Sequence, residues 1–178
     1  MTGAAWILLG WLVCVLLQGS LCSSASNNPI DNCWNNGNWQ QNRKKLADCA
    51  LGFGSAANGG KAGEIYTVTT SVDDATNPPA GSLRYGVTRK NPLWIVFAKD
   101  MNIKLKMPLV LTSQKTIDAR GAKVQIGNGP CLRIMNVNNV IIHGLQISNC
   151  VPNAAGNVLV SEGSVALMES QDGDAISV

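Results

Sequence analysis

The chain has 178 residues, a length that fits one ordinary domain, with 46% apolar residues, 14% charged residues and a formal net charge of +3. This combination excludes a disordered or acidic solvating chain, which carries few apolar residues and many charges, and the charged content is also too low for a long coiled coil. Aromatic residues make up only 5% of the chain and there are 18 glycines, so the composition favours strands and turns over long helices.

The first 25 residues contain no charged side chain. Their apolar stretch from Trp6 to Leu17 is twelve residues long, too short to cross a bilayer but typical of the apolar region of a signal peptide. Small residues follow at 23–25, as a signal peptidase requires, although a positively charged segment at the start is missing. A membrane anchor is the alternative. We expect a signal peptide over 1–25 and a secreted, extracellular mature chain over 26–178.

Cleavage at that point would leave four cysteines, Cys33, Cys49, Cys131 and Cys150. An even number in an oxidising compartment predicts two disulfides, and the absence of a C-x-x-C spacing argues against a zinc site. Four cysteines allow three pairings. The entropy of loop closure mildly favours the pairs that are near in sequence, Cys33 with Cys49 and Cys131 with Cys150.

Apolar residues at helical spacing predict a short amphipathic helix over 36–50, with Asn36 or Asn38 as its N-cap and Gly52 as its stop. The glycine-rich stretch 52–63 is expected to be a loop. Its first glycines also fit the start of a nucleotide-binding loop, but such a loop follows a strand and this one follows the predicted helix.

The remainder of the chain predicts strands, since short runs of Val, Ile and Leu are bounded by Gly, Pro, Asn or Asp. The expected strands are 65–69, 93–98, 103–107, 110–112, 124–126, 132–135 and 140–147. The stretches between them are too short and too irregular for crossover helices, which argues against a doubly wound parallel sheet.

A repeat underlies these strands. Ile95 and Ile117 are 22 residues apart, Ile117 and Ile141 are 24 apart, and a further unit of 35 residues reaches Ile176 with an insertion near 151–164. A period in the low twenties, made of strands and Asn-rich turns, indicates a solenoid. Because the leucine spacing of leucine-rich repeats is absent, the pattern predicts an all-β parallel β-helix.

Charge is distributed unevenly. All fourteen Lys and Arg residues precede residue 134, whereas the segment 134–178 carries only acids: Glu162, Glu169, Asp172 and Asp174. A basic, secreted body predicts an anionic partner such as an acidic polysaccharide or a membrane surface. Nucleic acid is not an expected partner, given the export signal and the absence of aromatic residues interleaved with basic ones.

Asp172 and Asp174 are the candidate metal ligands. On a strand, residues two apart project from the same face, so their two carboxylates can converge on one hard cation such as calcium. The alternative is a turn with solvated acids, since Asp-Gly is a common turn pair.

Several motifs along the chain carry a family resemblance. They are Gly59-Gly60-Lys61, Pro79-Ala80-Gly81-Ser82-Leu83-Arg84-Tyr85, Thr116-Ile117-Asp118-Ala119-Arg120-Gly121-Ala122, Asn139-Val140-Ile141-Ile142-His143-Gly144-Leu145 and Gln171-Asp172-Gly173-Asp174-Ala175-Ile176. This series resembles the N-terminal half of the pectate lyases, in particular the conifer pollen members known as major allergens.

The resemblance implies a right-handed parallel β-helix with a short N-terminal capping helix and the same local disulfide pairing. It also implies that Asp172 and Asp174 are Ca2+ ligands at a groove that binds polygalacturonate (pectin) of the cell wall. The implied reaction is β-elimination, in which calcium acidifies the C5 proton of the uronate, a base removes it, and an unsaturated sugar end forms.

The base that the resemblance implies is an arginine, and it matches no position here. Four arginines of the chain align with structural stretches instead: Arg84, Arg89, Arg120 and Arg133. The family carries the base and its remaining calcium carboxylates in later coils, whereas this sequence stops at Val178. We therefore assign no catalytic residue and expect a C-terminally truncated β-helix that binds calcium weakly and is inactive alone. A full-length protein is expected to be a monomer.

Two alternatives remain. A non-catalytic half β-helix would bind pectate or the cell wall through Lys104 and Lys106, which share one strand face, although a solvated outer face is the favoured explanation for them. Another β-helix enzyme such as a polygalacturonase would need a cluster of catalytic acids. His143, the only histidine, is expected to be packed or to end a strand rather than to act as a base.

Overall fold

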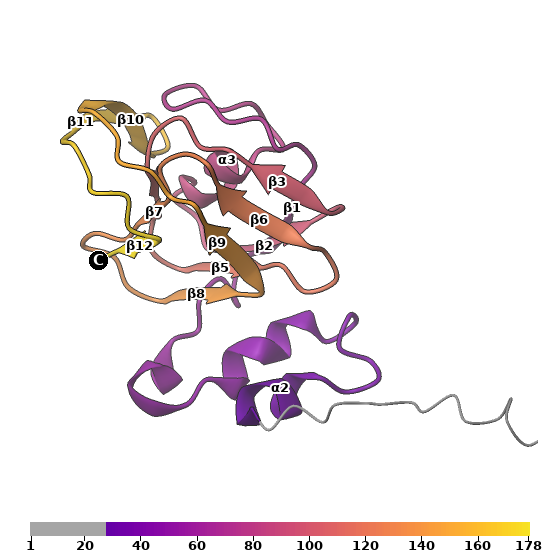
Figure 1. Ribbon diagram of the computed structural model, residues 1–178. Helices are drawn as coiled ribbons and strands as arrows, with labels where there is room; N and C mark the ends of the chain where they lie inside the picture. Colours follow the sequence, from indigo (N-terminus) through magenta and orange to yellow (C-terminus); the bar gives the residue numbers. More distant parts are fainter. Residues whose placement is uncertain (1–27) are drawn as a thin grey trace, which may run out of the picture.

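The structure is a computed structural model that describes residues 28–178, so the predicted signal peptide over 1–25 lies outside the described residues. Its body is a stack of short strands in three parallel sheets (Figure 1). Sheet A contains β1 (Glu64–Val68), β2 (Leu93–Phe97), β5 (Lys115–Asp118) and β8 (Val140–His143). Sheet B contains β3 (Met101–Ile103), β6 (Val124–Gly127) and β9 (Leu145–Ser148). Sheet C contains β4 (Leu109–Val110), β7 (Leu132–Arg133) and β12 (Ile176–Ser177).

Each coil passes through sheets A, B and C in turn, which makes the body a parallel β-helix, as the period predicted. Aliphatic rows run from coil to coil and form the core in the inner coils, whereas Ile176 at the end of its row is exposed. The pairing aligns Ile95 with Ile117 and Ile142 in sheet A, Ile103 with Ile126 and Ile147 in sheet B, and Leu109 with Leu132 and Ile176 in sheet C. Each such side chain, when fully buried, contributes about 1.5–3 kcal/mol of transfer free energy.

The period was right for the first unit and wrong by one residue for the second. Ile117 pairs with Ile142, and Ile141 lies beside Thr116 on the opposite face of sheet A. That outer face is itself covered, so Ile141 packs against Trp94. The proposed third unit is also wrong, because Ile176 pairs with Leu132 in sheet C rather than with Ile141 in sheet A.

The strand predicted over 140–147 is two strands, because the chain turns from sheet A to sheet B between them. Gly144 makes this turn with a φ of +77°, and a side chain there would contact the backbone of Ala119 at 3.4 Å. The other predicted strands match the observed ones to within a few residues, except that β5 was not in the predicted set and the strand predicted over 103–107 ends at Ile103.

Residues 28–63, here called the cap, cover the outer face of sheet A (Figure 1). They contain α2 (Pro29–Trp34) and two 3-10 helices, η1 (Arg43–Cys49) and η2 (Gly52–Ala56). The predicted helix over 36–50 is therefore only partly correct. Its first half is turns, where the Asn36 side chain accepts a hydrogen bond from the Asn38 backbone and competes with helix formation. The Cys33–Cys49 disulfide joins α2 to η1, as predicted.

Two elements depart from the coils. Helix α3 (Leu83–Val87) lies between β1 and β2. The stretch treated as an insertion forms an antiparallel hairpin of β10 (Gly156–Ser161) and β11 (Ser164–Met168). The Cys131–Cys150 disulfide joins the start of β7 to the end of β9, again as predicted. Within residues 28–178, no helix has the length and apolar character that a membrane crossing requires.

Candidate functional site

Asp172 and Asp174, here called the aspartate pair, lie at the end of the chain segment that leads into β12. Both are exposed, and the strand begins only at Ile176, so the expected strand alternation does not govern the direction of their side chains. Between them, Gly173 has a φ of +90°, and a Cβ atom there would approach the Pro152 nitrogen to 2.9 Å. The backbone of the pair is therefore pressed against the segment that follows Cys150.

This segment is anchored on both sides. The backbone of Gln171 exchanges two hydrogen bonds with that of Asn153, at 3.2 and 3.3 Å. After the pair, the Ala175 carbonyl accepts a hydrogen bond from Leu132 at 3.2 Å, which continues into the pairing of β12 with β7. The two carboxylates are thus held at the strand-start edge of sheet C rather than on a free tail.

The surroundings of the pair include a few side-chain oxygen donors, the ligands that calcium prefers, among mostly apolar neighbours such as Pro130, Leu132 and Val151. Asp174, Asn153 and Gln171 line one small hollow beside sheet C. The Oδ1 atom of Asn153 is buried there without a hydrogen-bond partner among the described residues. Over residues 28–178, no group of three or more His, Cys, Asp or Glu side chains is placed to hold a metal ion. The two carboxylates of the pair and Asn153 Oδ1 could thus supply only part of the six to eight oxygen ligands that calcium takes.

A groove runs from Gln171, the residue before the aspartate pair, along the outer face of sheet C, beneath hairpin β10–β11. One hollow of about 430 Å³ lies between Val110 of β4 and Met168 of the hairpin. A second, of about 320 Å³, continues past Arg133 and Glu169 to Gln171. The hollows form because the hairpin contacts β4 through a small apolar cluster but leaves the rest of the sheet uncovered.

Arg133, which the resemblance assigned to a structural stretch, lines the groove. It lies on β7 in register with Val110 of β4 and Ser177 of β12, in the row that faces outward from sheet C. Its guanidinium donates to Ser177 Oγ at 3.4 Å and contacts the sulfur of Met135. Among the residues that line the two hollows, it is the only cation. Only the pairing of β12 with β7, 44 residues apart in sequence, brings it near the aspartate pair.

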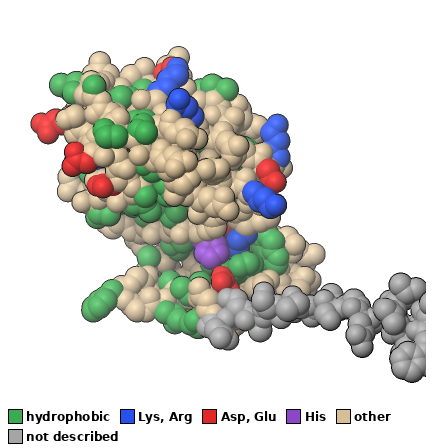
Figure 2. All heavy atoms as spheres, viewed as in Figure 1, with side chains coloured by type: hydrophobic (Ala, Val, Ile, Leu, Met, Phe, Trp, Pro, Cys, Tyr) green, Lys and Arg blue, Asp and Glu red, His purple; other side chains and the backbone are tan. Residues whose placement is uncertain are grey.

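The hairpin above the groove is tied to the rest of the protein. The Leu159 backbone donates to the Ala75 carbonyl and the Glu162 backbone to the Thr88 carbonyl, each at 2.7 Å. The Glu162 side chain also pairs with Arg89 at 3.1 Å. Acidic side chains gather on the hairpin side of the molecule, as Figure 2 shows, and this agrees with the acidic C-terminal segment of the sequence.

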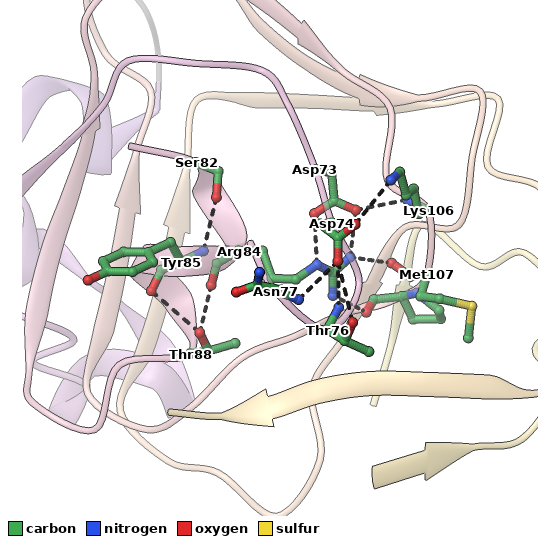
Figure 3. A network of polar contacts seen from close by, with 11 residues as sticks. Asp73, Asp74, Thr76, Asn77, Ser82, Arg84, Tyr85, Thr88, Lys106 and Met107 are labelled. Carbon is green, nitrogen blue, oxygen red and sulfur yellow. Dashed lines mark hydrogen bonds and ion pairs between the residues drawn. The ribbon is translucent and has the colours of Figure 1, made fainter. Parts of the chain in front are cut away.

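Beneath the hairpin, a buried ion pair fixes the start of β4 (Figure 3). Arg84 of α3 binds both carboxylate oxygens of Asp73, Nε to Oδ1 at 2.7 Å and Nη2 to Oδ2 at 2.9 Å. The same guanidinium donates to the carbonyls of Met107 at 2.6 Å and Pro108 at 2.9 Å. Asp73 also accepts from the Lys106 backbone at 2.8 Å. Arg84 is thus structural, as expected, and holds the turn that leads into the groove.

The two lysines considered for pectate binding follow β3 rather than lie within it. Lys104 and Lys106 are exposed on either side of the buried Leu105, so they do share one outward side. Lys106 is engaged, since its ammonium pairs with Asp74 at 3.1 Å (Figure 3). Backbone hydrogen bonds from Asn77 and Thr76, together with the Lys106 ammonium, hold the pKa of Asp74 well below its usual range.

A polar cluster joins the cap to sheet A, away from the groove along sheet C. Asp118 of β5 is fully buried and accepts hydrogen bonds from Arg43 of the cap at 3.0 Å, from Arg120 and from the Trp94 indole. Burial raises the pKa of Asp118, but the hydrogen bond and charge of Arg120 lead the opposing contributions, and the resulting pKa lies below its ordinary value. The Arg120 guanidinium stacks over Trp34 at 4.6 Å.

His143 belongs to this junction and not to the groove. Its ring meets the edge of Trp34 at a centroid distance of 5.6 Å, and Figure 2 shows the histidine at the seam between the cap and the body. Burial, followed by the positive charge of Arg120, lowers its pKa. His143 is therefore a packed residue at the end of β8, in agreement with the expectation from its strand pattern.

Comparisons with known proteins identify relatives of this chain in both sequence and structure. A pectate lyase of Chamaecyparis obtusa is 57% identical over 162 residues, which are 89% of this chain and 43% of that protein. A pectate lyase of Cryptomeria japonica is 54% identical over 171 residues, 94% of this chain and 46% of that protein. The crystal structure of jun a 1, the major allergen from cedar pollen, superposes with a TM-score of 0.82 at 56% identity, over 84% of this chain and 44% of that one. No family model matches the sequence.

The strand order and the anchored aspartate pair define a parallel β-helix protein with an acidic site beside sheet C. Its similarity to these proteins is high over nearly the whole described chain. The chain belongs to the pectate lyase family. It spans somewhat less than half the length of the relatives it matches.

Proposed function

We propose that this chain provides the amino-terminal coils of a secreted, calcium-dependent pectate lyase that cleaves polygalacturonate by β-elimination. The observation that carries the proposal is the aspartate pair, held by backbone hydrogen bonds at the head of a groove in a member of this family. The product of the proposed reaction would be an oligogalacturonide with an unsaturated end.

Asp172 and Asp174 are the residues that would hold calcium, with the unpartnered Oδ1 of Asn153 as a further oxygen donor nearby. When bound, calcium neutralises the uronate carboxylate and so acidifies the proton on the adjacent carbon. The backbone anchoring at Gln171 and Ala175 keeps the two carboxylates in place before a ligand arrives. Little ordering entropy is then lost on binding.

The groove would receive the substrate along sheet C. Arg133 supplies a positive charge that attracts a uronate carboxylate, and Met135 beside it offers an apolar surface to a sugar ring. Elimination removes the C5 proton and breaks the bond from C4 to the glycosidic oxygen, which leaves with the departing chain. We assign no residue of 28–178 as the base for this step. Because no base is assigned, we expect the chain alone to show no turnover. Because only two carboxylates are available, we expect it to bind calcium weakly.

A second candidate is a non-catalytic protein that binds pectate or the cell wall. It is favoured by the composition of the groove region, because the described residues contain the aspartate pair and one groove cation but no residue assigned as the base. Formation of unsaturated ends separates the two candidates, since a binding protein produces none. A polygalacturonase is disfavoured, because the relatives are named pectate lyases.

Secretion to the cell wall is part of the proposal, and the two disulfides support it, since such bonds persist in oxidising compartments. We further propose that pectin is the partner, that nucleic acid and membranes are not, and that the whole protein is a monomer.

Calorimetric titration with calcium tests the aspartate pair directly. We expect the purified chain to bind calcium with a Kd of roughly 1 mM, as for exposed extracellular sites. The variant Asp172→Asn with Asp174→Asn should lose this binding. Asp48→Asn with Glu64→Gln removes two exposed acids elsewhere and serves as the matched control. Equal loss of affinity in both double variants, or retained affinity in the first, would refute the assignment.

A further inference from the structure

A basic hollow of about 460 Å³ opens on the surface of the cap, away from the groove. Four cationic side chains line it, and only one acid, Asp48, lies among them. The cations are Arg43, Lys44, Lys45 and Lys61. Such a concentration of one sign of charge around a concave surface focuses the electrostatic potential and attracts anions.

The wall of this hollow is held in place by contacts to the rest of the protein. Arg43 is tied to Asp118 of sheet A, and the Lys44 ammonium donates to the Gly63 carbonyl. The Cys33–Cys49 disulfide closes the 3-10 helix that carries Lys44 and Lys45. The charges that a ligand contacts are therefore largely preorganised, and little conformational entropy is lost when it binds.

The charges are also available to a ligand. Lys45 is exposed, and the pair of Lys61 with Asp48 leaves their side chains 40% and 53% exposed. An exposed ion pair of this kind contributes little net free energy, because both partners remain well solvated. Lys61 can thus exchange Asp48 for the carboxylate of a ligand at small cost.

The remaining lining groups indicate the chemical class of the ligand. Gln40 and Gln41 add side-chain amides, which bind hydroxyl and carboxylate groups alike. No aromatic ring is among the residues that line the hollow, so it lacks the stacking platform on which proteins bind the bases of single-stranded nucleic acid. Ammonium, guanidinium and amide groups together suit a saccharide that carries carboxylates.

The cap hollow is separate from the groove along sheet C. The cap packs on the outer face of sheet A, whereas the groove and the aspartate pair lie along sheet C, another face of the β-helix. A polysaccharide bound at the cap therefore leaves the groove open.

We infer that the cap hollow is a second binding site for a carboxylated polysaccharide, which would hold the protein on its polymer while the groove engages another segment. The inference rests on the proposed function for the identity of the polymer, polygalacturonate. The hollow itself is argued from its own residues.

The test is binding of the purified chain to immobilised polygalacturonate in the presence of a calcium chelator, so that neither the aspartate pair nor turnover contributes. We expect Lys45→Gln with Lys61→Gln to weaken binding about fivefold at low salt. Lys99→Gln with Lys123→Gln removes two exposed lysines of the body and should change it less than about twofold. Asp48→Asn, which removes the acid of the hollow, should strengthen binding.

Equal weakening by both lysine variants would show diffuse charge attraction and overturn the inference. Absence of binding by the unaltered chain, or equal binding of fully methyl-esterified pectin, would overturn it too. The result is independent of lyase activity. If binding depends on the cap but the aspartate pair binds no calcium, the proposed function fails and the cap site stands.

Discussion

Asp118 and Arg43 are 75 residues apart in sequence, yet their side chains meet at 3.0 Å and join the cap to the β-helix. The same carboxylate holds Arg120 and the Trp94 indole, and it has no exposure to solvent. Asp118→Asn should therefore lower the free energy of unfolding by about 3–5 kcal/mol, because buried guanidinium groups lose their counter-charge. Denaturant unfolding measures the change. Asp48→Asn breaks an exposed pair and should cost less than about 1 kcal/mol.

The same junction predicts a loss of stability in mild acid. Burial and the Arg120 charge lower the pKa of His143, while Asp118 and Asp31 act in the opposite direction. The folded protein therefore binds this proton less readily than the unfolded chain. The stability that depends on neutral His143 is complete above its ordinary pKa of 6.5 and is lost as pH falls from there through the folded pKa.

Thermal unfolding between about pH 7.5 and pH 5 checks this prediction. The Tm of the unaltered chain should fall across this range, and His143→Gln should flatten the fall. Asp118 does not account for it, since its pKa is lowered and its contribution is lost only in stronger acid. An identical pH profile for both proteins would contradict the role given to His143.

Removing one partner of the buried Arg84–Asp73 pair should be costly, and removing both should be less so. Arg84→Met leaves the Asp73 carboxylate without its guanidinium in a site where both side chains are almost fully buried, at 0% and 2% exposure. We expect a loss of about 3–5 kcal/mol in the free energy of unfolding. Adding Asp73→Leu should recover part of that loss, as determined by a double-mutant cycle. A double variant less stable than Arg84→Met would show that the pair itself is not the main contribution.

The aliphatic rows explain why the fold was predictable. An inward position must be apolar in each successive coil, so Ile95 and Ile117 show the period in the sequence. The one-residue error arose because Ile141 and Ile142 are both aliphatic, and sheet A is covered on both faces. A period in the sequence shows which residues are buried but not which face of the sheet they point to, so it could not decide between Ile141 and Ile142.

Hairpin β10–β11 was missed for a different reason. It leaves the coil, so no repeat predicts it, although two short apolar runs separated by the residues around Glu162-Gly163 are a hairpin signal. The prediction of a helix over 36–50 was only partly right because Asn side chains there bind nearby backbone groups instead of leaving them to a helix. The spacing of apolar residues contains no sign of these local hydrogen bonds.

The assignment of Asp172 and Asp174 as metal ligands stays a prediction, because no group of three or more His, Cys, Asp or Glu side chains is placed to hold a metal ion among residues 28–178. Two carboxylates two residues apart predicted Asp172 and Asp174, and the resemblance gave them a role. The residues that hold or accompany them, Asn153 and Arg133, become neighbours only through pairings between distant segments. One sequence without its three-dimensional structure contains no signal for such contacts.

Gly173 provides a test of how the aspartate pair is held. In Gly173→Ala, the new Cβ would meet backbone atoms of Val151 and Pro152 at 2.9 Å, in addition to the strain of a positive φ. The segment must shift, so calcium affinity should fall about threefold or more by calorimetry, with a stability loss of roughly 1–3 kcal/mol. Gly163→Ala has a similar φ of +77° but nothing within 4 Å, so it should leave calcium affinity unchanged. Equal effects on affinity would contradict the anchoring argument.

The central claim, that this chain provides functional amino-terminal coils of a pectate lyase, is tested most directly in a hybrid protein. Residues 28–178 would be joined, where the two sequences cease to align, to the remaining length of the Chamaecyparis obtusa pectate lyase. We expect calcium-dependent release of unsaturated, ultraviolet-absorbing ends from polygalacturonate, abolished by Asp172→Asn with Asp174→Asn. A folded hybrid that releases no such ends, or that releases them undiminished without the aspartate pair, would contradict the claim.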